Sequence, residues 1–269
     1  MKLKSVFISG SAALMLMACT TNPITGRRSV QLVNDQQIAT MAVQQYQEVL
    51  SKSKVVRGTT AANQVKNVGL RIQNAANNYY RSIGRLDDLS EFKWEYNLIE
   101  DKSVNAWCMP GGKVAVYTGL LPVSQNDNGL AVVLGHEISH ALAGHGNERI
   151  SQGMIAQYGG AILGSTISSG QLAQVFRAAY PIGAQVALLK YGRSQELEAD
   201  EMGLYLMAMA GYDPRGASPF WDRMESMSTN GSRPPEFLST HPSPGNRKAQ
   251  IAKTLPKALE YYKAAGGKI

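Results

Sequence analysis

Apolar side chains recur every three to four residues through several stretches of the chain, the spacing that places them on one face of a helix. This pattern predicts amphipathic helices at about 35–52 and 60–83, and a third helix at about 128–144 with N-cap candidates at 126–128. Residues 149–190 are also helical in pattern but are interrupted by glycines. No apolar run there approaches the roughly 20 residues of a membrane-spanning helix, so a transmembrane hairpin is not expected.

Strict alternation of apolar and polar residues predicts strands elsewhere. Residues 91–99 alternate in this way and are expected to form one half-buried strand. Residues 105–117 predict a strand, a tight turn at Pro110 and the two glycines after it, and a second strand. Residues 20–34 are expected to form a tether and a first strand. The pattern therefore favours a mainly helical chain with a small sheet.

The helix at 128–144 contains His136, Glu137 and His140 in the arrangement H-E-x-x-H. Residues four apart on a helix lie within about 40° of each other in rotation, so the two imidazoles share one face. Two neutral nitrogens can then bind one divalent metal, while the adjacent carboxylate accepts a proton from the attacking water. The motif predicts a hydrolytic metal site.

His145 does not supply the third ligand in this interpretation. The metzincin pattern requires a glycine at 143 and a histidine at 146, whereas this chain has Ala143 and Gly146. His145 lies about 900° around the helix from His136, so it is expected to face away from the metal if the helix continues. We expect it to end that helix, where a histidine favours the helix dipole.

A second helix, which continues through Met207, offers Glu196 and Asp200 four residues apart. A carboxylate from a separate helix would complete a catalytic zinc site with an open fourth position, so Glu196 is the predicted third ligand. Asp200, one turn further, is expected to accept a ring N–H from a ligand histidine. Glu198 is the competing ligand, but it lies about 200° around the helix from Glu196.

Together these motifs resemble the gluzincin peptidases that include the CAAX prenyl endopeptidase, HtpX and BepA, and in particular their bacterial periplasmic lipoprotein branch. Residues 22–28 (NPITGRR), 105–119 (NAWCMPGGKVAVYTG) and 240–247 (THPSPGNR) extend the resemblance over most of the chain. It implies an α+β, mainly α, zincin-like fold whose small sheet has an edge strand above the H-E-x-x-H helix. It implies one zinc ion per chain, bound by His136, His140 and Glu196.

The same resemblance implies roles for further residues. Glu137 would be the general base, and Asp200 the carboxylate behind a ligand histidine. His241 and Arg247 would lie near the cleft. His241 is in a segment that prolines keep non-helical, where it would either stabilise the oxyanion or block the zinc, and these alternatives stay open. Asn105 and Ala106 would begin the edge strand, along which substrate binds as an added antiparallel strand.

The first residues predict export and anchoring. Lys2 and Lys4 precede an apolar run that ends in Leu16-Met17-Ala18-Cys19, a sequence that resembles a bacterial lipobox. We expect a signal peptide at 1–18, a lipidated tether at 19–34 that begins with Cys19, and one peptidase domain at 35–269. Thr20 favours the periplasmic face of the outer membrane. Cys108 is left without a disulfide partner and is expected to be a packed thiol.

The formal charge of the 269 residues is only +7, with no long basic run, so a nucleic-acid partner is not expected. Polypeptide substrates and a membrane attachment through the N-terminal lipid are the expected partners, and the oligomeric state stays open. The sequence predicts a zinc metalloendopeptidase of the cell envelope, acting on extended or misfolded proteins. The alternative is a non-proteolytic or latent lipoprotein chaperone or assembly factor with a blocked zinc site. A prenyl-protein endopeptidase is not expected, for want of membrane spans.

Overall fold

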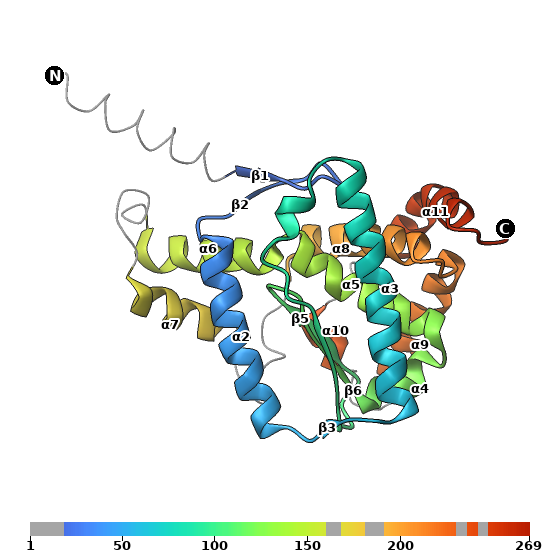
Figure 1. The fold of residues 1–269 in the computed structure, drawn as a ribbon, viewed down its shortest axis with the longest axis horizontal. Coiled ribbons are helices and arrows are strands. Elements are labelled where there is room, and N and C mark those ends of the chain that lie inside the picture. Colours follow the sequence, from blue (N-terminus) through green and yellow to red (C-terminus); the bar gives the residue numbers. More distant parts are fainter. Residues whose placement is uncertain (1–18, 160–167, 181–190, 230–235, 242–246) are drawn as a thin grey trace.

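The computed structural model describes residues 19–159, 168–180, 191–229, 236–241 and 247–269. Helices make up most of this part of the chain and surround a small mixed sheet (Figure 1). The predicted α+β, mainly α fold is therefore confirmed. The predicted signal peptide and parts of stretches 149–190 and 240–247 lie outside the described residues. Of the helices that are described, none is both long and apolar enough to cross a membrane.

The strands are β1 (Cys19–Thr21), β2 (Arg28–Val30), β3 (Val55–Val56), β4 (Glu95–Ile99), β5 (Ala106–Met109) and β6 (Lys113–Tyr117). The described helices are α2 (Asp35–Lys52), α3 (Thr60–Ser82), α4 (Leu121–Ser124), α5 (Asp127–Leu142), α6 (His145–Tyr158), α7 (Ser169–Ala179), α8 (Arg193–Met209), α9 (Ala217–Thr229), α10 (Glu236–Thr240) and α11 (Arg247–Ala264). Short 3-10 turns are η1 (Leu86–Leu89), η2 (Thr118–Leu120) and η5 (Pro214–Gly216). The first two predicted helices correspond to α2 and α3, and the third to α5.

The central sheet has the strand order β3-β4-β6-β5, in which β4 and β6 are parallel and the other pairs antiparallel. Strand β5 is therefore an edge strand, and it packs against α5, the helix that carries H-E-x-x-H. β1 and β2 form a separate antiparallel pair. The predicted edge strand above the metal helix is present.

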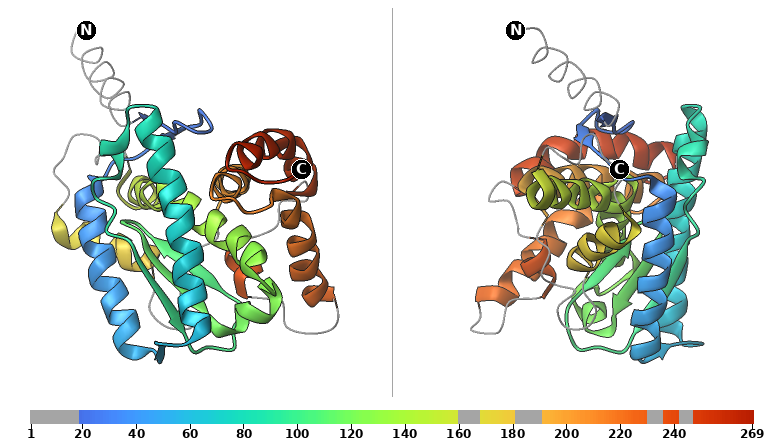
Figure 2. Two further views of the ribbon diagram at one scale, coloured as in Figure 1. Left: turned by 45° about the vertical axis from the view of Figure 1, so that its right-hand side comes forward. Right: turned by 90° about the vertical axis from the view of Figure 1, so that its left-hand side faces the viewer.

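Both faces of β5 are buried, because successive residues of a strand point to opposite faces. Ala106 and Cys108 join the apolar cluster that α3, α5 and α8 form, whereas Trp107 and Met109 join the cluster that α2, α6 and α7 form. Cys108 is 4% exposed, as expected for a packed thiol. Figure 2 shows the sheet (green) between α2 (blue) and the helices of the C-terminal part (orange to red).

The strand predicted at 91–99 is shorter in the structure, since β4 begins only at Glu95. The backbone N–H groups of Lys93 and Glu95 instead donate to the carbonyl oxygens of Gly111 and Gly112 in the β5–β6 turn, at 2.9 and 3.0 Å. The Trp94 ring fills the space beside Gly112, where a side chain would lie 2.7 Å from it. The apolar alternation of this segment therefore reflects packing on the turn as well as strand pairing.

Helices α5 and α8 approach closely where a glycine of one faces a glycine of the other. A Cβ atom on Gly135 would lie 2.8 Å from the carbonyl oxygen of Gly203, and one on Gly203 would lie 2.8 Å from the backbone nitrogen of His136. Any larger residue at either position would push the helix backbones apart. This contact brings His136 directly against α8, the helix that carries Glu196 and Asp200.

Gly203→Ala is expected to lower the free energy of unfolding, although alanine favours helices by about 1 kcal/mol over glycine. Overpacking of a close contact costs about 1–3 kcal/mol, and the opposing atoms here belong to backbone that cannot rotate away. Urea unfolding measures the difference. Gly170→Ala in α7 is the matched control, because a Cβ atom there meets nothing within 4 Å. Equal stability of the two variants would contradict the proposed contact.

Candidate metal centre

Four side chains of metal-ligand type meet between α5, α8 and the end of α10. His136 and His140 come from α5, Glu196 comes from α8, and His241 directly follows α10. One ligand atom of each lies within 4.8 Å of the others, and all four residues are buried. The Nε2 atoms of His136 and His140 are 3.0 Å apart, and Oε1 of Glu196 lies 3.4 Å from Nε2 of His140. The structure brings the three predicted ligands together and places His241 among them.

The hydrogen bond behind His136 directs its free nitrogen into this cluster. Nδ1 of His136 lies 3.0 Å from Oδ1 of Asp200, the carboxylate predicted for this position. A carboxylate accepts, so Nδ1 carries a proton, and in the neutral ring that binds a metal Nε2 presents its lone pair to the other ligand atoms. Imidazole nitrogens and a carboxylate oxygen are the donors that zinc and similar divalent metals prefer.

The charges around the cluster also fit a cation. Three carboxylates, those of Glu137, Glu196 and Asp200, are buried together with one guanidinium, that of Arg247. Arg247 donates from Nε to Asp200 at 2.7 Å and from Nη2 to Glu196 at 2.9 Å, and its Cζ lies 3.9 Å from the centre of the Trp221 ring. Buried charges require compensation. Arg247 compensates only part of the carboxylate charge at the ligand atoms, and a bound divalent cation would compensate more of it.

The pKa values of the clustered side chains reflect both burial and the neighbouring charges. Burial opposes the charged form of His136, but hydrogen bonds to Asp200 and Glu196 outweigh it and raise its pKa to about 9. Burial likewise opposes ionisation of Glu196, yet the surrounding histidines, His241 foremost, hold its pKa well below the usual range. Burial raises the pKa of Glu137. Burial lowers the pKa of His140 well below its usual range, which keeps this ring neutral. The carboxylates thus favour a positive charge beside His136, while His140 stays available as a neutral ligand.

Glu137 faces a small cavity beside the cluster. This cavity of about 40 Å³ is lined by residues 105–109 of the edge strand, by Glu137 and by His241, among others. The Glu137 carboxylate accepts from the backbone N–H of Cys108, and its Oε1 lies 3.3 Å from Nε2 of His241. Among the described residues, Oε1 has no hydrogen-bond partner. It is placed to accept a proton from a molecule in the cavity.

The predicted substrate strand lies along the same cavity. Asn105 directly precedes β5, which begins at Ala106, and both residues line the cavity with Glu137. The Asn105 side chain accepts from the Ala106 N–H at 2.9 Å, and its carbonyl accepts from Tyr117 at 3.0 Å. No other described strand pairs with the outer edge of β5. An extended peptide could pair with this edge.

His145 is outside the ligand cluster, as predicted, but the expectation that it ends the H-E-x-x-H helix and faces away from the metal is wrong. Helix α5 ends at Leu142, and Gly144 adopts a left-handed conformation with φ +67°, so the chain reverses and α6 begins at His145. The histidine therefore turns back toward the cluster, and its Nδ1 lies 2.8 Å from Nδ1 of His140. The signal for this reversal was the glycine at 144, a common helix-terminating position.

Tyr191 is a neighbour of the cluster that the sequence did not indicate. Its ring stacks on His140, with ring centres 3.7 Å apart and planes at 27°, and it lies 5.0 Å from the ring of His241. The guanidinium carbon of Arg149 lies 4.0 Å from the centre of the Tyr191 ring. Tyr191 thus contacts both the ligand histidines and a cationic side chain. No local pattern marks such a long-range stacking contact.

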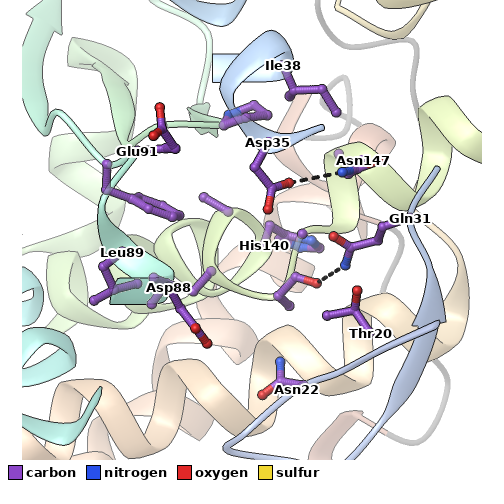
Figure 3. Close-up of a pocket in the computed structure, with 18 of the residues that line it drawn as sticks. Thr20, Asn22, Gln31, Asp35, Ile38, Asp88, Leu89, Glu91, His140 and Asn147 are labelled. Atoms are coloured by element: carbon purple, nitrogen blue, oxygen red, sulfur yellow. Dashed lines mark hydrogen bonds between the residues drawn. The ribbon is translucent and has the colours of Figure 1, made fainter. Parts of the chain in front are cut away.

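A second cavity, of about 300 Å³, has His140 in its lining (Figure 3). Its walls come from the N-terminal segment, the loop around η1 and the ends of α5 and α6. Asn147 donates to Asp35 at 3.0 Å, and Gln31 donates to the carbonyl oxygen of Ala143 at 3.3 Å, which ties these walls together. Tyr191 lines both cavities.

A model of peptidase family M48 matches residues 69–255, most of the chain. The chain belongs to peptidase family M48. The matched M48 region includes α5 and α8 with their paired motifs, so the resemblance to the gluzincin peptidases is confirmed.

Curated relatives carry metalloendopeptidase and protease names. The chain is 37% identical to the mitochondrial metalloendopeptidase OMA1 of Schizosaccharomyces pombe over 171 residues, which cover 63% of this chain and 49% of that protein. It is 29% identical to OMA1 of Homo sapiens over 248 residues, 89% of this chain and 46% of that protein. It is 31% identical to the beta-barrel assembly-enhancing protease of Yersinia pestis over 163 residues, 57% of this chain and 33% of that protein. The chain thus spans half or less of the length of these relatives.

Proposed function

We propose that this chain is a zinc metalloendopeptidase that hydrolyses peptide bonds in extended or misfolded proteins. The observation that carries the proposal is the position of Glu137. Its carboxylate has one oxygen without a hydrogen-bond partner among the described residues, and it faces a cavity beside three ligand residues and an edge strand. Membership of family M48 and the printed names of the relatives support the same activity.

We further propose that one zinc ion is bound by His136, His140 and Glu196. Two histidines and one carboxylate with an open fourth position are the donor set of catalytic rather than structural zinc. When bound, the zinc ion would polarise the scissile carbonyl and increase the acidity of the attacking water.

The protein's own groups then have distinct tasks. The outer edge of β5 offers backbone groups that hold the peptide in extended form, largely irrespective of its side chains. Glu137 takes the proton of the attacking water and passes it to the leaving amine. Asp200 holds His136 in one orientation, and Arg247 holds Asp200. The burial of the cluster excludes bulk water from these charges.

Glu137→Gln is expected to keep the bound zinc but to reduce peptide hydrolysis by about 10²–10⁴-fold, the usual contribution of general acid–base catalysis. The amide has nearly the same shape but cannot take the proton. Hydrolysis of unfolded casein, with metal analysis of the same samples, measures both properties. Glu201→Gln is the control that should keep wild-type rates, because Glu201 is half-buried on α8 and its carboxylate accepts from Tyr205 and Gln250 rather than from the ligand cluster. Wild-type turnover by Glu137→Gln would refute the proposed mechanism.

A latent or non-proteolytic lipoprotein is the second candidate function, and one observation favours it. Nδ1 of His241 lies 3.2 Å from Nε2 of His136 and 3.1 Å from Oε1 of Glu196, within the ligand cluster itself. In this position the imidazole competes with the attacking water. The same side chain would stabilise an oxyanion only after moving out of the cluster.

His241→Ala separates these roles. If His241 blocks the site, its removal raises the rate of casein hydrolysis, and the geometry leads us to expect this rise. If His241 stabilises the oxyanion, the rate falls by about 10²–10³-fold, as for other donors to an oxyanion. Zinc content measured in parallel shows whether the loss of the imidazole also changes metal binding. A fall in rate at constant zinc content would contradict the blocking role.

We also propose that the protein is lipid-anchored through Cys19 in the bacterial cell envelope and that it faces the periplasm from the outer membrane. The lipobox-like sequence before Cys19 and the threonine after it support this location. The printed name of the Yersinia pestis relative is in keeping with envelope protein quality control, whereas the OMA1 relatives are named as mitochondrial. Polypeptides and the membrane are the proposed partners, with no role for nucleic acid.

Cys19→Ser is expected to shift the protein from the lipid-anchored mature form to an unprocessed or unlipidated form. Each buried acyl methylene contributes about 0.8 kcal/mol to membrane binding, so several chains give stable attachment that serine cannot replace. Cell fractionation and mass spectrometry of the N-terminal peptide measure the change. Cys108→Ala is the control, because it removes the other, buried cysteine and should leave anchoring intact. An unmodified Cys19 in the wild-type protein would disprove the lipoprotein assignment.

A further inference from the structure

A line of buried polar groups leads from the ligand cluster to the N-terminal segment. Nδ1 of His140 lies 2.8 Å from Nδ1 of His145, and Nε2 of His145 lies 2.9 Å from Oε2 of Glu198. Glu198 in turn accepts hydrogen bonds from the Thr25 hydroxyl and from Nε of Arg27. His140, His145 and Glu198 are each at most 4% exposed. Of these residues, only His140 belongs to the ligand cluster.

The positions of the protons on the two imidazole rings follow from the charge of Arg27, at the outer end of this line of hydrogen bonds. Arginine is always protonated in proteins, so the Glu198 oxygen that faces Arg27 is that of a carboxylate and accepts from His145 Nε2–H. A neutral imidazole carries one N–H, which leaves Nδ1 of His145 as an acceptor. His140 must then donate from its own Nδ1. Its Nε2 is left with a lone pair that points at the ligand cluster.

The arrangement repeats, with one more residue, what Asp200 does for His136. There a carboxylate accepts directly from Nδ1 of the ligand histidine, at 3.0 Å. Here His145 stands between the ligand histidine and the carboxylate of Glu198. In both cases the group behind the ligand selects the tautomer whose Nε2 can bind a metal.

Arg27 holds the outer end of this line by joining two helices. Its Nη1 and Nη2 donate to both oxygens of Glu148 on α6, at 3.0 and 2.7 Å, while Nε donates to Glu198 on α8. Gln195 also donates to Glu148 at 2.8 Å. Arg27 therefore neutralises two carboxylates that would otherwise face each other, and it fixes the acceptor on which the proton of His145 depends.

We propose that His145 and Glu198 are positioning residues that fix the metal-binding tautomer of His140, and that Arg27 and Thr25 make the N-terminal segment part of the metal centre. The inference rests on the proposed zinc site but not on peptide hydrolysis. It predicts that detaching the N-terminal segment from α8 weakens metal binding. Among the described hydrogen bonds, Thr25 and Arg27 reach the ligands only through Glu198 and His145. Attachment of this segment thus regulates the affinity of the centre.

The test measures the zinc dissociation constant of the full chain, by competition with a chromophoric chelator at neutral pH. His145→Leu should raise it by about 10–100-fold, the usual effect of removing the group behind a ligand histidine. His145→Gln should restore most of the affinity, because its carbonyl can accept from His140 while its amide donates to Glu198. The ¹⁵N signals of His140 in the metal-free protein should show the Nδ1–H tautomer in the wild type and a mixture of tautomers in His145→Leu.

Arg27→Ala tests the N-terminal end and should also weaken zinc binding, by up to about 10-fold. Arg28→Ala is the matched control, because it removes the same charge from the adjacent, exposed residue and should leave affinity unchanged. Thermal unfolding of each metal-free variant checks that the fold is retained. If His145→Leu does not fold, the comparison of Arg27→Ala with Arg28→Ala decides the proposal.

Several results would overturn the proposal. Wild-type zinc affinity in both His145→Leu and Arg27→Ala would show that the line of hydrogen bonds has no effect on the centre. Equal losses in His145→Gln and His145→Leu, with an unchanged His140 tautomer, would show that His145 acts only by packing. A wild-type protein that binds no zinc would refute the metal site and this inference together. Because the measurement is zinc affinity, the rate of peptide hydrolysis does not enter it.

Discussion

The close crossing of α5 and α8 is the constraint on which the rest of the structure depends. Gly135 and Gly203 allow the two backbones to approach so nearly that the amide of His136 lies against α8. At a wider separation Glu196 and Asp200 would not reach the histidines of α5, since their side chains are short. The crossing also constrains the sequence of both helices, because each must combine its polar ligands with a glycine at the point of contact.

The crossing buries charges, and the surrounding residues compensate for them in two lines. One line runs from His136 through Asp200 to Arg247, and the other runs from His140 through further groups to Arg27. Removing either arginine would leave buried carboxylates unpaired, which is far more costly than losing a surface ion pair. The two arginines come from opposite ends of the chain, so the centre is complete only when both ends are folded onto α8. Its ligand geometry is thus a property of the whole fold.

The parts of this site that could be predicted from sequence are those that local periodicity determines. Spacing of four residues placed His136 with His140, and Glu196 with Asp200, on single helix faces, and the family resemblance supplied the pairing of the two helices. His145 could not be placed correctly in the same way, because one left-handed residue, Gly144, reverses the chain and invalidates any helical projection beyond it. Arg27 and Tyr191 join the centre through contacts with residues far away in the sequence, for which no local pattern exists. The beginning of β4 was misjudged for a related reason, because Trp94 packs on a turn that lies later in the chain.

The N-terminal segment links the proposed anchor to the proposed catalysis by a short path. Cys19 and Arg27 are eight residues apart, and eight residues span at most about 29 Å even when fully extended. A lipid on Cys19 would therefore hold the metal centre close to the membrane surface. Since β1 pairs with β2 and the intervening turn is bound to α8, the anchor is joined to the body of the protein without a free linker. A displacement of Cys19 would act first on the β1–β2 pair and through it on Arg27 and Thr25. These are the residues whose hydrogen bonds to Glu198 lead to His140.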